Sequence, residues 1–151
     1  MDRAHWPQAA LPVATAIFSM LLLSSGICGA AEVELPSALV CSFDEGVFTV
    51  FENGGFKTKQ TDGGDHFVIA AIDATAGKAQ IVGNAGAANV AMVVGEATAT
   101  FIERTPMGNI NTTTIYLKLE GTRFPAVESR HVGDAFGLML SQNYGYCEAR
   151  S

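Results

Sequence analysis

The sequence predicts an all-β domain, a small antiparallel barrel of about eight strands closed by one disulfide. Short runs rich in β-branched and aromatic residues recur about every ten residues from Leu39 onward, and clusters of Gly, Asn or Asp separate them. No helical period of apolar residues appears in this region. Cys41 and Cys147 stand near its two ends. A β-sandwich of similar size is the alternative.

In the first half of this region, turn-forming residues bound each expected strand. Asp44–Gly46 is expected to turn the first strand into the second. Asn53–Gly55 favours a hairpin because Asn and Gly tolerate positive φ. After a turn at Thr61–Asp65 comes a run that is apolar on both faces, so it should be covered on both sides. The expected strands are Leu39–Phe43, Val47–Phe51, Phe56–Lys59, Phe67–Ile72 and Lys78–Val82.

The second half of this region shows the same spacing of short expected strands and turns. Gly83–Gly86 predicts a β-turn, and Thr105–Asn109 joins the two strands of the clearest hairpin. The return strand of that hairpin has a Thr-rich face, which is typical of a solvated antiparallel strand. The expected strands are Val90–Val94, Thr98–Glu103, Thr112–Leu119 and a short closing strand, Asn143–Cys147. The stretch Phe124–Gln142 is less regular.

The first 31 residues have the three-part order of a secretory signal peptide. A short start containing Arg3 precedes the uncharged stretch Ala9–Leu23, and small residues end the segment before Glu32. We expect cleavage after Ala31 or Ala30. This would leave residues 32–151 as a single β-domain, periplasmic or secreted, with no membrane span.

Two other fates of this segment stay open. A lipoprotein site at Cys28 is suggested by position, but Ile27 stands where a small residue is normally required. A retained anchor would need about 20 apolar residues, and Pro12 interrupts the run.

The cysteine pattern agrees with export. Cys28 would leave with the signal peptide, and an even pair in an oxidising compartment predicts a Cys41–Cys147 disulfide. Such a bond would stabilise the fold by roughly 4–5 kcal/mol in the chain-entropy model. Two buried free thiols are the alternative.

The charge balance is acidic. Fifteen Asp and Glu stand against nine Lys and Arg, for a formal net charge of −6 at pH 7. Nucleic-acid binding is disfavoured because no basic stripe is present to displace counterions. A basic protein partner in the cell envelope fits this charge.

Glu128-Ser129-Arg130-His131, with Asp134 close behind, has the residue types of a nucleophilic site. A hydrolase using Ser129 and His131 is therefore an alternative function. No G-x-S-x-G sequence is present, however, and a solvated polar strand or loop accounts for the same residues.

We expect no metal and no cofactor. His66 and His131 are the histidines beyond the signal peptide, and no ligands are paired at the short spacing typical of zinc sites. Asp62, Asp65 and His66 are better explained by a Gly-rich turn. Gly83–Ala88 lacks the order of a phosphate-binding loop and no helix pattern follows it.

The less regular late segments are the candidates for recognition, since aromatic and Arg-bearing segments on a rigid β-scaffold suit binding. Packing in the core is the alternative for their aromatic residues. The candidate binding residues are Phe124, Ser129, Arg130, His131, Gln142 and Tyr144.

Two resemblances bear on function. Thr100–Asn109, Phe124–His131 and Ser141–Cys147 resemble segments of small exported Gram-negative bacterial proteins that have no assigned activity. The resemblance covers most of the second half of the mature chain and implies a periplasmic or secreted setting.

The second resemblance is architectural. A signal peptide, a small β-barrel, the early sequence Cys41–Gly46 and the late Cys147 are similar to the periplasmic inhibitors of c-type lysozyme. Those proteins insert a loop with a Ser-Gly pair and a downstream Tyr into the lysozyme cleft. That loop has no counterpart after Gly95, so no inhibitory residue is assigned.

Together these observations predict a non-enzymatic binding or inhibitor-like module. A structural envelope protein is a further alternative beside the hydrolase.

Overall fold

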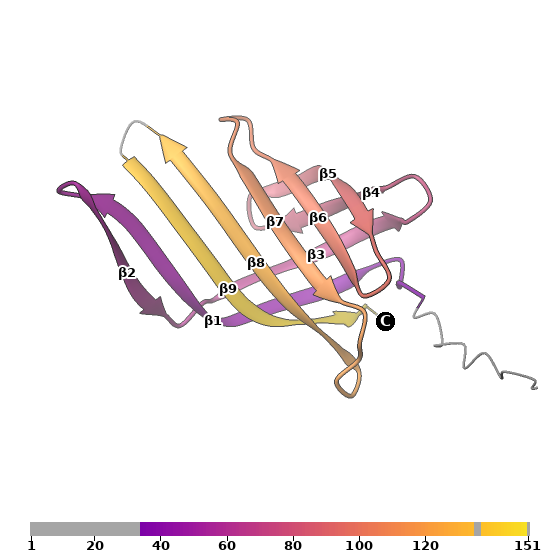
Figure 1. The fold of residues 1–151 in the computed structure, drawn as a ribbon. Helices are drawn as coiled ribbons and strands as arrows, with labels where there is room; N and C mark the ends of the chain where they lie inside the picture. Colours follow the sequence, from indigo (N-terminus) through magenta and orange to yellow (C-terminus); the bar gives the residue numbers. More distant parts are fainter. Residues whose placement is uncertain (1–33, 135–136, 151) are drawn as a thin grey trace, which may run out of the picture. The chain divides into compact units, whose positions relative to one another are not determined.

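The computed structural model describes residues 34–134 and 137–150, which form a sheet of nine antiparallel strands (Figure 1). The expected signal peptide, residues 1–31, lies outside the described residues. Within the described part no helix is long and apolar enough to cross a bilayer. The strands are β1 (Leu39–Glu52), β2 (Gly55–Thr61), β3 (Asp65–Asp73), β4 (Lys78–Gly83), β5 (Gly86–Val94), β6 (Thr98–Arg104), β7 (Ile110–Tyr116), β8 (Arg123–Asp134) and β9 (Gly137–Ala149).

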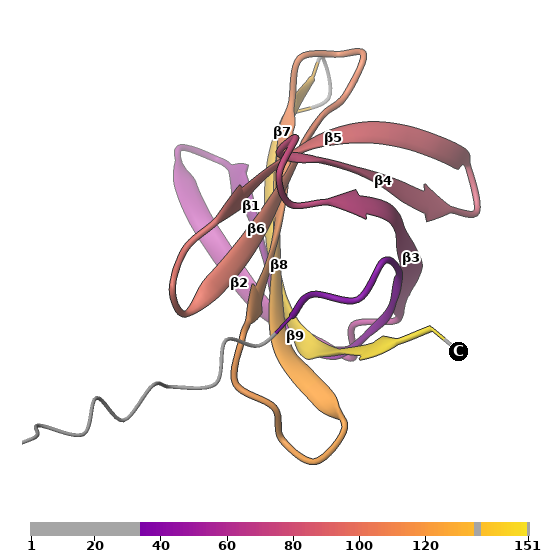
Figure 2. The ribbon, with the colours of Figure 1, turned by 90° about the vertical axis from the view of Figure 1, so that its right-hand side faces the viewer.

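The strands other than β2 form a closed barrel (Figure 2). Neighbours in sequence pair from β3 to β9, and β1 closes the ring by pairing with β3 on one side and β9 on the other. Cys41 and Cys147 face each other across the β1–β9 pair and form the expected disulfide. The prediction of a disulfide-closed barrel is confirmed, and the closed ring excludes the sandwich.

β1 is one long strand, where the sequence predicted two strands joined by a turn. Its register against β9 shifts between Phe43 and Glu45, so Asp44 is the extra residue of a β-bulge. The first half of β1 pairs with β3, and the second half, from Gly46, pairs with β2. The turn prediction was wrong because a bulge and a turn use the same polar and glycine residues, and long-range pairing selected the bulge.

The β1–β2 hairpin follows the prediction. Asn53 and Gly54 have φ values of 51° and 77°, and they join the paired residues Glu52 and Gly55. Positive φ at both central residues suits the right-handed twist of the flanking strands.

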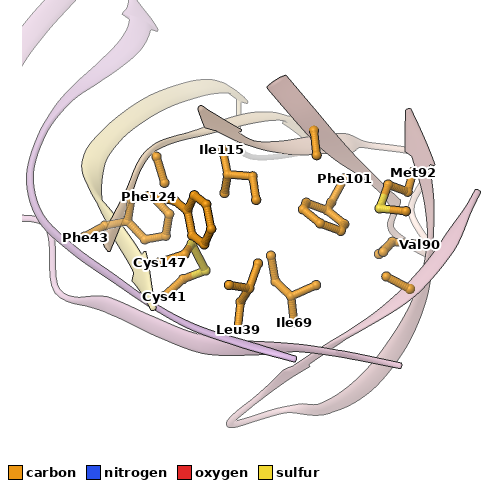
Figure 3. Close-up of a cluster of buried hydrophobic side chains, with 13 residues drawn as sticks. Leu39, Cys41, Phe43, Ile69, Val90, Met92, Phe101, Ile115, Phe124 and Cys147 are labelled. Atoms are coloured by element: carbon orange, nitrogen blue, oxygen red, sulfur yellow. A yellow bond between two sulfur atoms is a disulfide. The ribbon is translucent and has the colours of Figure 1, made fainter. Parts of the chain in front are cut away.

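The core lies inside the barrel (Figure 3). Side chains that alternate along each strand point inward, and the disulfide lies among them. Its members are Leu39, Cys41, Phe43, Ile69, Ala79, Val90, Met92, Ala99, Phe101, Ile115, Phe124, Ala126 and Cys147.

The described residues of the stretch Phe124–Gln142, which was expected to be irregular, belong to the long strands β8 and β9. These strands pair from Arg123 with Glu148 to Asp134 with Gly137. The hydrophobic alternation fails here because both faces of β8 carry polar residues near one end of the barrel: Glu128 and Arg130 point inward and Ser129 and His131 outward.

Candidate functional site

One end of the barrel has a polar interior. The inward positions that continue Phe101, Ile115 and Ala126 along their strands are Glu103, Thr113 and Glu128. With neighbouring inward side chains they surround a cavity of about 660 Å³. We call this opening the mouth. Its polar wall is Asp65, Glu103, Asn111, Thr113, Glu128 and Arg130, and its opposite wall is the small-residue tip of the β4–β5 hairpin, Gly83–Ala88.

Glu128 is the most deeply placed charged group of this network. Its side chain is 5% exposed and accepts hydrogen bonds from Arg130 Nε at 2.9 Å and from Asn143 Nδ2 at 3.0 Å. Arg130 also lies 3.4 Å from Asp65, and Asn143 Nδ2 donates to the same aspartate at 2.9 Å. Arg130 and Asn143 therefore each connect Glu128 to Asp65.

Burial raises the pKa of Glu128 above its ordinary value of 4.5 because the charged carboxylate loses solvent. The hydrogen bond from Asn143 and the charge of Arg130 oppose this effect, while the nearby Asp65 carboxylate adds to it. The positive charge of Arg130 is thus shared by two carboxyl groups.

Glu103 and Asn111 form a second polar pair on the same wall. Asn111 Nδ2 donates to Glu103 Oε2 at 2.8 Å across β6 and β7. Among the described residues Asn111 Oδ1 is buried without a hydrogen-bond partner, and Glu103 has no cationic partner within salt-bridge distance. A buried acceptor without a donor is costly. This part of the mouth therefore has an unused capacity to accept hydrogen bonds.

The mouth favours a positively charged group over a negative one. Three carboxyl groups line it against the single guanidinium of Arg130, which already contacts Glu128 and Asp65. An anion would have to compete with both carboxylates for Arg130, whereas a cation meets Glu103 and the free Asn111 oxygen. Within the described residues no group of three or more potential metal ligands is present.

The candidate binding residues predicted from the sequence do not lie together. Arg130 faces the mouth. Ser129, His131 and Gln142 lie on the opposite face of β8 and β9, along a shallow depression of about 240 Å³. Tyr144 is exposed further along β9 and donates to Gln142 at 3.0 Å.

Phe124 is 4% exposed and packs in the core, directly across the β8–β9 pair from Cys147. Ser129 and His131 share a face and a depression, but no hydrogen bond joins them in the described part of the chain. The hydrolase function stays a prediction.

The sequence reasoning missed most of the mouth: Asp65, Glu103, Asn111 and Glu128 were not among the candidate binding residues. Asn143, which donates to Glu128 and Asp65, was not among them either. A usable pattern was present, since Glu103 and Glu128 each occupy an inward position two residues beyond an apolar core residue. A polar residue at an inward position is expected to be either paired or functional.

Comparison with models of protein families, with curated proteins and with solved structures finds no match.

Proposed function

We propose that the protein is an exported, non-enzymatic binding module that receives a cationic side chain of a basic partner in the mouth of its barrel. The observation that carries this proposal is the imbalance of charge in the cavity, where three carboxyl groups surround one already paired guanidinium. The unused acceptor on Asn111 supports the same conclusion, because Lys and Arg side chains carry only donors.

The net charge of the chain supports this proposal at longer range. An acidic domain with a net charge of −6 attracts a basic partner and speeds its association. Binding should weaken as salt screens this attraction.

A c-type lysozyme is the first partner to test, because it is a basic protein and because the sequence resembles its periplasmic inhibitors in the placement of Cys41–Gly46 and Cys147. Residual lysozyme activity would be measured against increasing amounts of the mature domain, residues 32–151, and affinity by calorimetry. A pull-down from envelope extract would identify another basic partner. Absence of inhibition at large molar excess would remove lysozyme as the target.

A matched pair of variants tests the mouth itself, with whichever partner binds. Glu103→Gln keeps the acceptor for Asn111 but removes the charge, and it should weaken binding about tenfold. Glu96→Gln removes an exposed charge from the loop between β5 and β6 and should leave affinity nearly unchanged. Equal affinity of the two variants would place the binding site elsewhere.

Export is part of the same proposal. Mass spectrometry of the protein from periplasm or medium should give an N-terminus at Glu32 or Ala31. Intact Met1 in the membrane fraction would contradict it.

A further inference from the structure

Two strands of the closed barrel, β5 and β6, part beside the mouth. β5 pairs with β4 from Gly86 to Ala91, but it pairs with β6 only from Ala91 to Val94. Over Gly86–Val90 the outer edge of β5 therefore has no strand partner among the described residues. Figure 2 shows the tip of the β4–β5 hairpin standing away from β6 and β7. We call the gap between Gly86–Val90 of β5 and Glu103–Arg104 of β6 the seam.

The backbone groups that face the seam can be assigned from neighbouring hydrogen bonds. Met92 N–H donates to the Gly77 carbonyl on the β4 side, and Gly95 N–H donates to the Thr98 carbonyl on the β6 side. Because these directions alternate along an antiparallel strand, Ala87 and Asn89 present their N–H and C=O groups to the seam. An added strand could therefore form backbone hydrogen bonds with two alternate residues of β5.

The side chains on this edge do not obstruct such pairing. The edge reads Gly-Ala-Ala-Asn-Val and contains no charge and no proline. The outer edge of β2, which also has no strand partner among the described residues, carries the exposed residues Lys57 and Lys59. Lysines protect an edge strand against pairing with other chains. The edge of β2 therefore carries residues that disfavour pairing with another chain, whereas the edge of β5 at Gly86–Val90 carries none.

The seam opens directly into the mouth. The cavity is lined on one side by Ala85–Ala88 and on the other by Glu103. A strand that pairs with β5 would present every second side chain to this cavity. Its cationic residues would then meet Glu103 and the free Asn111 oxygen.

We propose that the partner is bound by strand addition: an extended basic segment pairs with β5 along Gly86–Val90 and directs a Lys or Arg side chain into the mouth. This inference rests on the proposed function and specifies the partner's conformation. Backbone pairing supplies affinity and the cavity supplies the preference for charge.

The probes are three end-blocked hexapeptides, and calorimetry would measure their affinity for residues 32–151. The first alternates Lys and Val. The second has the same sequence with alternate residues N-methylated, which removes backbone donors on one edge and keeps the charges. The third alternates Glu and Val. We expect the N-methylated peptide to bind at least about tenfold more weakly than the first and the acidic peptide not to bind.

Ala87→Pro removes one donor on the protein side. Proline is tolerated in an edge strand where the missing N–H faces outward, so pairing between β4 and β5 should persist. The variant should lower the affinity for the Lys-Val peptide several-fold and leave the affinity for the N-methylated peptide unchanged. Ala87→Lys places a lysine on this edge, as on β2, and should lower the affinity for the Lys-Val peptide to a similar extent.

The outcomes separate the two proposals. Equal binding of the first two peptides, sensitive to Glu103→Gln, would overturn strand addition and keep the cation site. Binding of neither peptide, or binding insensitive to Glu103→Gln, would remove the cation site as well. Sedimentation that shows a dimer lost on Ala87→Lys would assign the seam to a second copy of this chain and overturn the inference.

Discussion

Glu128 lies in the barrel interior at the point where the apolar core ends and the mouth begins. Its raised pKa means that the native state holds the carboxyl proton more tightly than the unfolded chain does. The resulting stabilisation is complete below the ordinary pKa of 4.5. It is lost as the pH rises through the higher pKa of the native state, where burial penalises the carboxylate.

Replacing Glu128 with Gln tests this linkage. Gln keeps the shape but has no proton to lose, so the variant should become more stable relative to the wild type as the pH rises above about 4.5. Urea denaturation of both proteins across this pH range measures the difference in free energy of unfolding. A difference that is constant with pH would contradict the assignment.

Asn143 holds the two carboxylates of the network together by donating to both Asp65 and Glu128. Asn143→Ala leaves these acceptors with fewer donors in a buried site and should lower the free energy of unfolding by roughly 1–3 kcal/mol. Gln142→Ala changes the adjacent exposed residue and should lie within about 0.5 kcal/mol of the wild type. Chemical denaturation at neutral pH compares the two, and equal losses would mean that the network adds no stability.

Among the strands, β1 changes its partner on one side part-way along its length. Past the bulge at Asp44 its second half leaves β3 and pairs with β2, so β2 is joined to the barrel through β1. Glycines allow the neighbouring backbone to approach β1 closely on both sides of the bulge. A Cβ on Gly145 would overlap the Ser42 carbonyl, and one on Gly63 would overlap the Phe43 carbonyl. Gly63 also has a φ of 67°, which disfavours other residues.

Gly46→Ala tests how tightly β1 packs on the network. A Cβ at this position would overlap Asn143 Oδ1 and lie 2.9 Å from the Gln142 carbonyl oxygen, so we expect a loss of about 1–3 kcal/mol. Gly83→Ala is the control, because nothing lies within 4 Å of a Cβ there and its φ is not positive. The control should be neutral or stabilised by up to about 1 kcal/mol. Thermal melts of both variants suffice, and a neutral Gly46→Ala would contradict the packing.

For the molecule as a whole, the Cys41–Cys147 disulfide links the two strands that close the barrel, 106 positions apart in sequence. Both cysteines are fully buried, so a reductant should act on the native state slowly. Their long separation makes the unfolded chain the state most affected by the cross-link.

Removal of the disulfide should therefore cost roughly 4–5 kcal/mol of stability in the chain-entropy model. Denaturation of the Cys41→Ala/Cys147→Ala double variant, beside the wild type, measures this loss. A thiol assay of the wild type under denaturing, non-reducing conditions should find no free sulfhydryl from this pair. Two free thiols would contradict the bond.

Local features of the sequence were sufficient to predict the all-β class, the Asn53–Gly55 hairpin, the turn before Gly86 and the cysteine pair. These depend on alternation of side chains, tolerance of positive φ and the chemistry of thiols, all of which act over a few residues or on residue type. Barrel closure was an expectation from the number of strands and became a finding through the β1–β9 pairing.

The bulge in β1 and the network of the mouth follow from contacts between segments that are far apart in sequence. The length of β8 and β9 and the position of the seam depend instead on how far neighbouring strands stay paired. Asn143 meets Asp65 across 78 positions, and neither residue stands out in its own strand. Alternation assigns a side chain to a face, but it does not say which end of the barrel remains polar or where two strands part. Hydrogen bonds between strands decide both, because each depends on a partner strand that the local sequence does not specify.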